Sequence, residues 1–194
     1  MATKPLLILA SQSPRRKKLL TDAGYSFVVH PPEEDVEPPV TNEQPPEEQV
    51  RRSSFLKAQN VAGQTDKGIV LAADTVAECH GKVMGKPRDR DHARQMLETM
   101  SGQSHRVLTG VTLWAKPGDR YVTYCESTTL EMKPLPPDTL NEILDSGGWR
   151  GKAGGFGFQD DLDWLMIVEG LESNVVGLPV ERLPGWLAAL ATKQ

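Results

Sequence analysis

The chain has 194 residues, a formal net charge of −4, and a composition of 38% hydrophobic and 25% charged residues. These values indicate a globular protein, expected to form one domain over residues 1–194, and no stretch is long and apolar enough to predict a signal peptide or a membrane span. The negative net charge argues against nucleic acid or an acidic membrane as partner, so any anion site must come from a local basic cluster.

In the first half of the chain, apolar runs and turn residues predict strands that alternate with helices. Strands are expected at 6–10, 25–30, 69–73 and 75–79, the last followed by a hairpin turn at Gly81-Lys82. Helices are expected from Pro14 to about Ala23, from about Glu47 to Val61, and over 89–102. Ser13 is the expected N-cap of the first helix and Gly24 its stop. A proline-rich acidic loop, PPEEDVEPPVTNEQPPEEQ, separates the second strand from the second helix.

The second half begins with a long hairpin, because two runs rich in Val, Thr and aromatic residues flank a Pro-Gly-Asp turn. These runs are 105–115 and 121–132. A short helix within 136–148, beginning at Asp138 or Thr139, a strand over 163–170 and a separate short helix over 184–192 after the break at Pro184 are expected next. The whole pattern predicts an α/β fold with a mixed twisted sheet flanked by helices.

The stretch SQSPRRKK at 11–18 predicts an anion site at the first helix N-terminus. Backbone N–H groups and hydroxyls there can bind phosphate oxygens, and arginine adds a fork of donors. Arg15 and Arg16 lie in the first turn, where the helix dipole disfavours cations. A bound anion would remove that conflict, whereas the alternative interpretation is a solvated basic helix face.

Asp74 follows the apolar residues 69–73 and is a candidate for proton transfer or metal binding. Ligands of α/β proteins collect where strands end, and a carboxylate there can orient a water molecule or hold a divalent cation. The alternative interpretation is an aspartate that caps a helix or closes a turn.

Three lysines could reach a phosphate as point charges: Lys57 on a helix, Lys86 before a proline, and Lys152 in a glycine-rich run. Each could equally be a solvated surface lysine. The glycine-rich run, GKAGGFGFQDD at 151–161, permits close approach of a ligand, and its Gln159 could hydrogen-bond a base edge. The alternative is a flexible loop.

The acidic loop offers four carboxylates for Mg²⁺ or, alternatively, for solvent: Glu33, Glu34, Asp35 and Glu37. The histidines show no zinc-site spacing. The cysteines, Cys79 and Cys125, show no metal or redox spacing, which fits a reducing, cytoplasmic protein.

Six segments, taken in order, resemble the Maf family of nucleoside triphosphate pyrophosphatases. They are LILASQSPRRKKLL, FLKAQNVA, AADTVAECHGKVMGKPRD, MSGQSHRVLTGV, KAGGFGFQ and SNVVGLP. The resemblance implies a fold related to inosine triphosphate pyrophosphatases. It also implies hydrolysis of a nucleoside triphosphate to the monophosphate and pyrophosphate, with a divalent cation, Mg²⁺ or Mn²⁺, as cofactor.

The resemblance also assigns roles to single residues. Asp74 would be the proton acceptor and a metal ligand, with Asp35 or Glu37 as a further metal-side carboxylate. The phosphate neighbourhood maps onto Ser11, Arg16, Lys57 and Lys86. Arg15, Thr75 and Gln159 match the dTTP/UTP type at the three positions that separate subfamilies, and they would read the base.

Two other functions remain open at the level of sequence. Members of the family are linked to septum formation, so a nucleotide-binding regulator of cell division with little turnover is one alternative. A single-strand nucleic-acid binder is another, although the net charge and the lack of interleaved basic and aromatic residues argue against it. The resemblance is also compatible with a homodimer.

Overall fold

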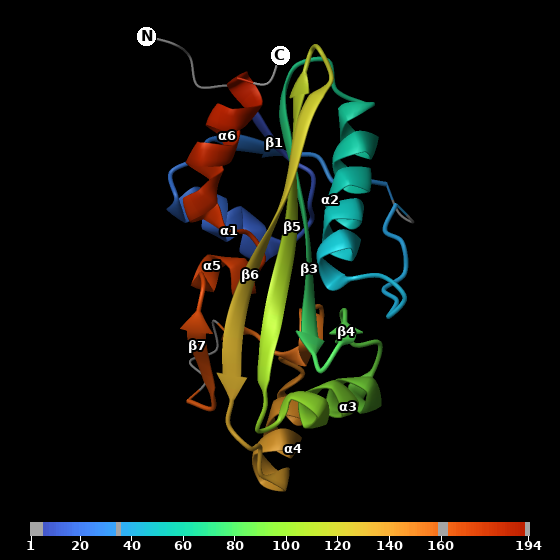
Figure 1. Ribbon diagram of the computed structural model, residues 1–194, viewed down its shortest axis with the longest axis vertical. Coiled ribbons are helices and arrows are strands. Elements are labelled where there is room, and N and C mark those ends of the chain that lie inside the picture. The colour runs from blue at the N-terminus through green and yellow to red at the C-terminus, as the bar shows by residue number, and fades with distance from the viewer. Residues whose placement is uncertain (1–5, 34–35, 159–162, 193–194) are drawn as a thin grey trace.

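A seven-stranded mixed sheet runs the length of the computed structural model, which describes residues 6–33, 36–158 and 163–192 (Figure 1). Its strands are β1 Leu7–Leu9, β2 Phe27–Val29, β3 Gly68–Cys79, β4 Lys82–Met84, β5 Ser104–Lys116, β6 Arg120–Met132 and β7 Leu165–Glu169. The order is β2-β1-β3-β5-β6-β7, and β4 pairs with β3. The pairs β2–β1 and β1–β3 are parallel and the others antiparallel, which confirms the predicted mixed α/β sheet.

Six α-helices and short 3₁₀ turns complete the described structure. The helices are α1 Pro14–Asp22, α2 Pro46–Ala62, α3 Arg90–Met100, α4 Pro137–Ser146, α5 Glu172–Val176 and α6 Leu183–Thr192. Ser13 caps α1 as predicted, its hydroxyl accepting the Arg16 N–H at 3.4 Å. Pro184 lies in the first turn of α6, where a missing N–H removes no helix bond, and α6 is the separate helix that was predicted. No helix in these ranges is long and apolar enough to cross a bilayer.

Helices cover both faces of the sheet, and alternate residues of β3 show which helix covers which face. On one face, Val70 and Ala72 pack against α2. On the other face, Leu71 and Ala73 belong to a core that includes residues of α1 and α6. Further along that second face, Ala77 belongs to a separate core formed with α3 and α4. Figure 1 shows α1 and α6 toward one end of the long strands and α3 and α4 at the other end.

The prediction of two separate strands at 69–73 and 75–79 is wrong, because β3 continues through both. Its pairing with β5 extends over residues 68–78 and holds it extended throughout. The strands that end near Asp74 are β1 and β4, which pair with β3 on the side away from β5. On that side, β1 pairs with 69–71 and β4 with 77–79, and no described strand pairs with 72–76. Asp74 therefore lies within a continuous strand, beside a gap in the sheet edge, which excludes the turn or cap interpretation.

Two boundaries also differ from the predictions. Helix α4 begins at Pro137, before Asp138 or Thr139, because proline is favoured in the first helical turn and its fixed φ suits that position. The β3–β4 hairpin is confirmed, but its two turn residues are His80 and Gly81. Their φ values of 53° and 77° are those of a type I′ turn, which matches the twist of paired strands.

Candidate active site

A cleft of about 880 Å³ opens at the gap in the sheet edge and gathers most of the predicted site residues. Its described walls come from the β1–α1 turn, residues 32–33 and 36–37, α2, β3, residues 150–153 and 156–158, and α5. Ten predicted residues line it: Ser11, Arg15, Arg16, Glu33, Glu37, Lys57, Asp74, Thr75, Lys86 and Lys152. Three other predicted residues, Glu34, Asp35 and Gln159, lie outside the described residues.

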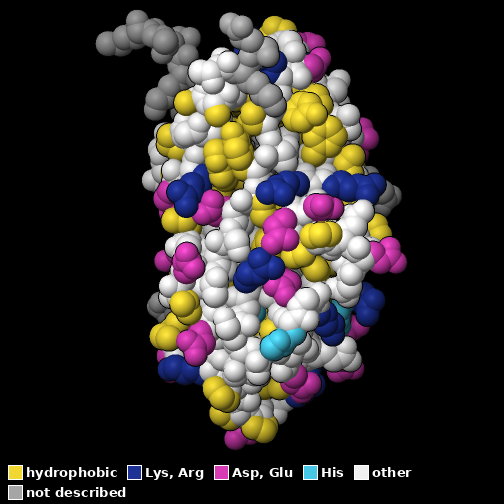
Figure 2. Space-filling model, viewed as in Figure 1, with side chains coloured by type: hydrophobic (Ala, Val, Ile, Leu, Met, Phe, Trp, Pro, Cys, Tyr) yellow, Lys and Arg dark blue, Asp and Glu magenta, His cyan; other side chains and the backbone are white. Residues whose placement is uncertain are grey.

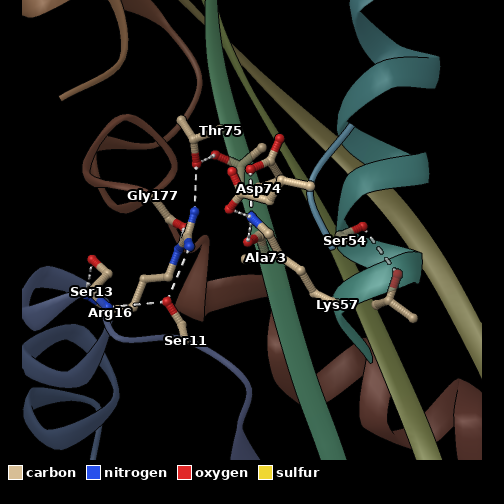
Figure 3. Close-up of polar contacts among 12 residues, drawn as sticks. Ser11, Ser13, Arg16, Ser54, Lys57, Ala73, Asp74, Thr75 and Gly177 are labelled. Carbon is tan, nitrogen blue, oxygen red and sulfur yellow. Dashed lines mark hydrogen bonds and ion pairs between the residues drawn. The ribbon is translucent and has the colours of Figure 1, made fainter. Parts of the chain in front are cut away.

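The Arg16 side chain is held by three hydrogen bonds from three separate segments (Figure 3). Its Nε donates to the Gly177 carbonyl at 2.8 Å, Nη1 to Ser11 Oγ at 3.2 Å, and Nη2 to Thr75 Oγ1 at 3.1 Å. Burial lowers the pKa of the Arg16 guanidinium, against the opposite influence of Asp74 and Glu37. The group nevertheless stays charged, because arginine is not deprotonated in proteins. A desolvated cation fixed in this way is prepared to bind an anion.

Lys57 reaches across from α2 and lies between two carboxylates. Its Nζ is 2.7 Å from Asp74 Oδ1 and also pairs with Glu37. The side chain is 5% exposed, so the interpretation of Lys57 as a solvated surface lysine is wrong. Partial burial raises the pKa of Glu37, but Lys57, Lys86 and Arg16 outweigh this effect and the pKa is lowered overall.

The sheet itself brings α2 close enough for this contact. Gly110 of β5 is the cross-strand partner of Asp74, so both residues face α2. A Cβ built on Gly110 would lie only 2.1 Å from the Val50 carbonyl oxygen. Helix α2 therefore lies directly on the backbone of β5, and Lys57, two turns after Val50, extends over Asp74.

The carboxylates of Asp74 and Glu37 fit a magnesium-type cation whose remaining ligands come from water and substrate phosphates. Asp74 and Glu37 already surround one cationic group, the Lys57 ammonium. Among the described residues there is no cluster of three His, Cys, Asp or Glu side chains that could enclose a metal alone. Mg²⁺ is often held by one or two carboxylates, with waters and substrate phosphates completing its shell. Two carboxylates beside a cationic cleft match that pattern.

Charge is concentrated in the cleft. Six of its described lining residues are basic: Arg15, Arg16, Lys57, Lys86, Arg150 and Lys152. Three are acidic: Glu33, Glu37 and Asp74. The described lining therefore has a formal charge of +3, in a chain whose total is −4. Such a local excess attracts a polyanion that the rest of the molecule repels.

Several residues and contacts at the cleft were missed from the sequence. Arg150 lines the cleft and stacks over the Trp149 ring at 4.9 Å. The Gly177 carbonyl, in the SNVVGLP segment, is a direct partner of Arg16. Arg15 donates to the Gly151 carbonyl at 2.8 Å, which ties α1 to the glycine-rich segment. The available signals were that Arg150 lies beside a matching segment and that Gly177 lies within one, but neither shows which atoms meet.

Known proteins that resemble this chain share one family. The sequence matches the family model described as Maf-like protein over residues 6–190. It is 49% identical to a dTTP/UTP pyrophosphatase of Rhodopirellula baltica, across 91% of this chain and 78% of that protein. It is 42% identical to a protein of the same name from Carboxydothermus hydrogenoformans, across 91% and 94%.

Solved structures give weaker matches. A nucleoside-triphosphatase, dITP/XTP pyrophosphatase, from Mycobacterium abscessus aligns with a TM-score of 0.47 at 15% identity, covering 97% of this chain and 100% of that one. A HAM1 protein from Coxiella burnetii aligns with a TM-score of 0.45 at 16% identity, covering 66% and 73%. These structural likenesses are too weak to assign a family. The match over residues 6–190 and the sequence identities above do assign one: the chain belongs to the Maf family.

Proposed function

We propose that this protein hydrolyses dTTP, UTP and related or modified pyrimidine nucleotides to the monophosphate and pyrophosphate. The observation that carries the proposal is the cleft, in which an excess of basic side chains surrounds the carboxylate of Asp74. Relatives named dTTP/UTP pyrophosphatase support the choice of substrate.

In this proposal the triphosphate lies along the cationic wall of the cleft. Arg16 and Ser11 bind phosphate oxygens at the start of α1, and Lys57 and Lys86 bind from the opposite side. Arg16 has five N–H groups, of which three make the hydrogen bonds described above. Within the described structure, two remain for phosphate oxygens.

Asp74 is the proposed proton acceptor. The attacking water loses a proton to Asp74 while its oxygen bonds to the α-phosphorus, and the bond from that phosphorus to the bridging oxygen breaks. Pyrophosphate leaves with the bridging oxygen, and the cationic side chains stabilise its charge. Lys57, 2.7 Å from Asp74 Oδ1, holds the carboxylate in place.

A divalent cation, Mg²⁺ or Mn²⁺, would be held by Asp74 and Glu37, and Asp35 is a further candidate outside the described residues. When bound, it would supply additional positive charge against the triphosphate. Lys57 occupies the space between the two described carboxylates, so cation binding requires that ammonium to shift.

Base preference is proposed to depend on Arg15 and Gln159. Arg15 contacts the glycine-rich segment through the Gly151 carbonyl, so it lies where that segment lines the cleft. Gln159 lies outside the described residues. The Thr75 hydroxyl faces Arg16, so any contribution of this hydroxyl passes through the Arg16 guanidinium.

Pyrophosphate release from a panel of nucleoside triphosphates, including dTTP, UTP, CTP and purine nucleotides, tests the function. Wild type should turn over the pyrimidine nucleotides fastest, and Asp74→Asn should lose turnover by a factor of roughly 10² to 10⁴ while remaining folded. Release near background in both proteins would contradict the proposal. Nucleotide-dependent stabilisation against heat without release would favour the nucleotide-binding regulator instead.

We further propose a cytoplasmic setting and no nucleic-acid partner. Cys79 and Cys125 are free, which suits a reducing compartment. Acidic and basic side chains lie side by side across the middle of the face in Figure 2, where an extended nucleic-acid surface would need one sign of charge. A homodimer stays a prediction, which sedimentation of the purified protein at several concentrations would test.

A further inference from the structure

A buried polar cluster lies behind Arg16, on the face of the sheet that carries α1 and α6. Thr109 of β5 and Asn174 of α5 are both 0% exposed. Thr109 stands between Val107 and Val111 on the same face, and these two valines belong to the two separate apolar cores. Burying two polar side chains between apolar cores is costly unless their hydrogen bonds serve the structure or a site.

The hydrogen bonds of this cluster lead to Arg16. Thr109 Oγ1 is 3.0 Å from Thr75 Oγ1, and Thr75 Oγ1 accepts from Arg16 Nη2 at 3.1 Å. At the other end, Thr109 Oγ1 donates to the backbone carbonyl of Asn174 at 2.9 Å. The chain therefore runs from Arg16 through two hydroxyls to α5.

The direction of every proton in this chain follows from chemistry. A carbonyl only accepts, so the single hydroxyl proton of Thr109 points at Asn174. The Thr75–Thr109 contact must then be donated by Thr75, whose own proton is thereby committed. Thr75 consequently presents only a lone pair to Arg16, which is the orientation that a guanidinium requires. Aligned hydroxyl dipoles of this kind strengthen one another and stabilise the positive charge.

Asn174 also fixes the second contact of Arg16. Its Nδ2 donates to the Val107 carbonyl and to Thr128 Oγ1, both at 3.0 Å, which fastens α5 to β5 and β6. Three residues later, the Gly177 carbonyl accepts from Arg16 Nε at 2.8 Å. One short helix therefore supports the guanidinium twice, directly and through the two threonines.

We propose that Thr109 and Asn174 are positioning residues that orient Arg16 for phosphate binding, and that Thr75 transmits their effect instead of contacting the base. The inference rests on the proposed function only in that Arg16 binds the substrate phosphates. Because Arg16 meets the triphosphate common to all substrates, the threonine chain acts on every nucleotide alike.

The test uses conservative threonine variants with a matched control. Thr109→Val and Thr75→Val remove the hydroxyls, whereas Thr109→Ser and Thr75→Ser retain them. Thr112→Val is the control, since Thr112 is also 0% exposed and lies on β5, but its hydroxyl bonds Ser54 and Thr123 on the other face. All variants are first checked for a cooperative unfolding transition.

The first readout needs no turnover. The Nε–H of Arg16, assigned in ¹⁵N-arginine NMR spectra as the signal lost in Arg16→Lys, should be protected from solvent exchange in wild type. Thr109→Val and Thr75→Val should shift this signal and speed its exchange, whereas both serine variants and Thr112→Val should leave it near its wild-type position. An unchanged signal in folded Thr109→Val and Thr75→Val would overturn the proposal, even if the protein hydrolysed no nucleotide at all.

The second readout is kinetic. Thr75→Val and Thr109→Val should lower kcat/KM by the same factor for dTTP, UTP and purine nucleotides, roughly ten- to a hundredfold, as for one lost hydrogen bond to a charged group. The serine variants should restore most of it. The double valine variant should cost no more than the worse single variant, because both interrupt one chain. A changed order of nucleotide preference in Thr75→Val, with the best substrate unaffected, would show direct base contact and overturn the proposal.

Discussion

Asp74 and Thr75 are neighbours in β3, yet their side chains leave opposite faces of the sheet, Asp74 toward Lys57 and Thr75 toward Arg16 (Figure 3). Both can border one cleft because the sheet edge is open at this point, between the end of β1 and the end of β4. The alternation of a strand thus separates two tasks by one residue: the proposed proton acceptor lies on one face and the support of the phosphate-binding arginine on the other.

Replacing Lys57 should damage both turnover and stability. Lys57→Met leaves Asp74 and Glu37 without their shared cation, so we expect pyrophosphate release to fall at least roughly a hundredfold. The free energy of unfolding should drop by about 2 kcal/mol, less than for a fully buried pair because the Glu37 side chain is 50% exposed. Denaturant titration and a pyrophosphate assay measure the two effects.

The matched control for Lys57 is an exposed pair on α1. Lys18 lies 2.9 Å from Asp22, with side-chain exposures of 68% and 58%. Lys18→Met removes the same type of charge from a solvated pair, so stability should change by less than about 0.5 kcal/mol and turnover should not change. Equal effects of the two substitutions would contradict the role assigned to Lys57.

The two arginines at the start of α1 should respond differently to substitution. Arg16→Lys loses the fork that contacts Ser11, Thr75 and Gly177, so kcat/KM should fall roughly a hundredfold for every nucleotide. Arg15→Lys should mainly change the ratio of kcat/KM between pyrimidine and purine nucleotides. The same substrate panel measures both, and a selective effect of Arg16→Lys or a uniform effect of Arg15→Lys would contradict this division.

How much the sequence predicts depends on the range of the interactions involved. The Ser13 cap, the turn at 117–119 and the separate helix at Pro184 were predicted because each depends on neighbouring residues. The continuity of β3 was not, because it depends on pairing with β5 more than thirty residues away. The apolar residues on both sides of Asp74 would form the same sequence pattern whether β3 itself or its partner β1 ended there.

The site divides in the same way. The motifs identified most of the residues that line the cleft, because the charged and hydroxyl side chains of each matching segment are visible in the sequence itself. They did not reveal that Arg16 meets Gly177, 161 positions later, or that Thr109 stands behind Thr75. Such contacts follow from strand register and helix placement, which leave no local sequence pattern. Thr109 in particular looks like an ordinary strand threonine until its partners are seen.

Gly110 should tolerate no side chain. In Gly110→Ala the new methyl group would lie 2.1 Å from the Val50 carbonyl oxygen, so α2 must move away from β5. We expect a loss of about 3 kcal/mol in the free energy of unfolding, and reduced turnover because Lys57 moves with α2. A Cβ added at Gly185 of α6 would meet nothing within 4 Å, so Gly185→Ala should be neutral or stabilise by up to about 1 kcal/mol. Urea denaturation compares the two, and similar stabilities would refute the packing argument.

His105 should make stability depend on pH. The ring is 2% exposed and meets the Phe156 ring edge-on at 5.4 Å. Burial lowers its pKa from 6.5 to about 4, against weaker opposite effects of the Gln103 backbone and Glu78. The unfolded chain therefore takes up a proton at a higher pH than the folded chain. The stabilisation from neutral His105 is complete above pH 6.5 and is lost as pH falls toward 4.

The expected size of this effect is about 2 kcal/mol in the free energy of unfolding between pH 7.5 and pH 5. The comparison stops at pH 5 because Glu37, whose pKa is lowered in the folded state, adds a loss of the same sign at lower pH. His105→Phe removes the titrating group, so urea midpoints of the variant should change much less over this range, whatever its stability at pH 7.5. A variant that loses as much stability as wild type on going from pH 7.5 to pH 5 would show that another group is responsible.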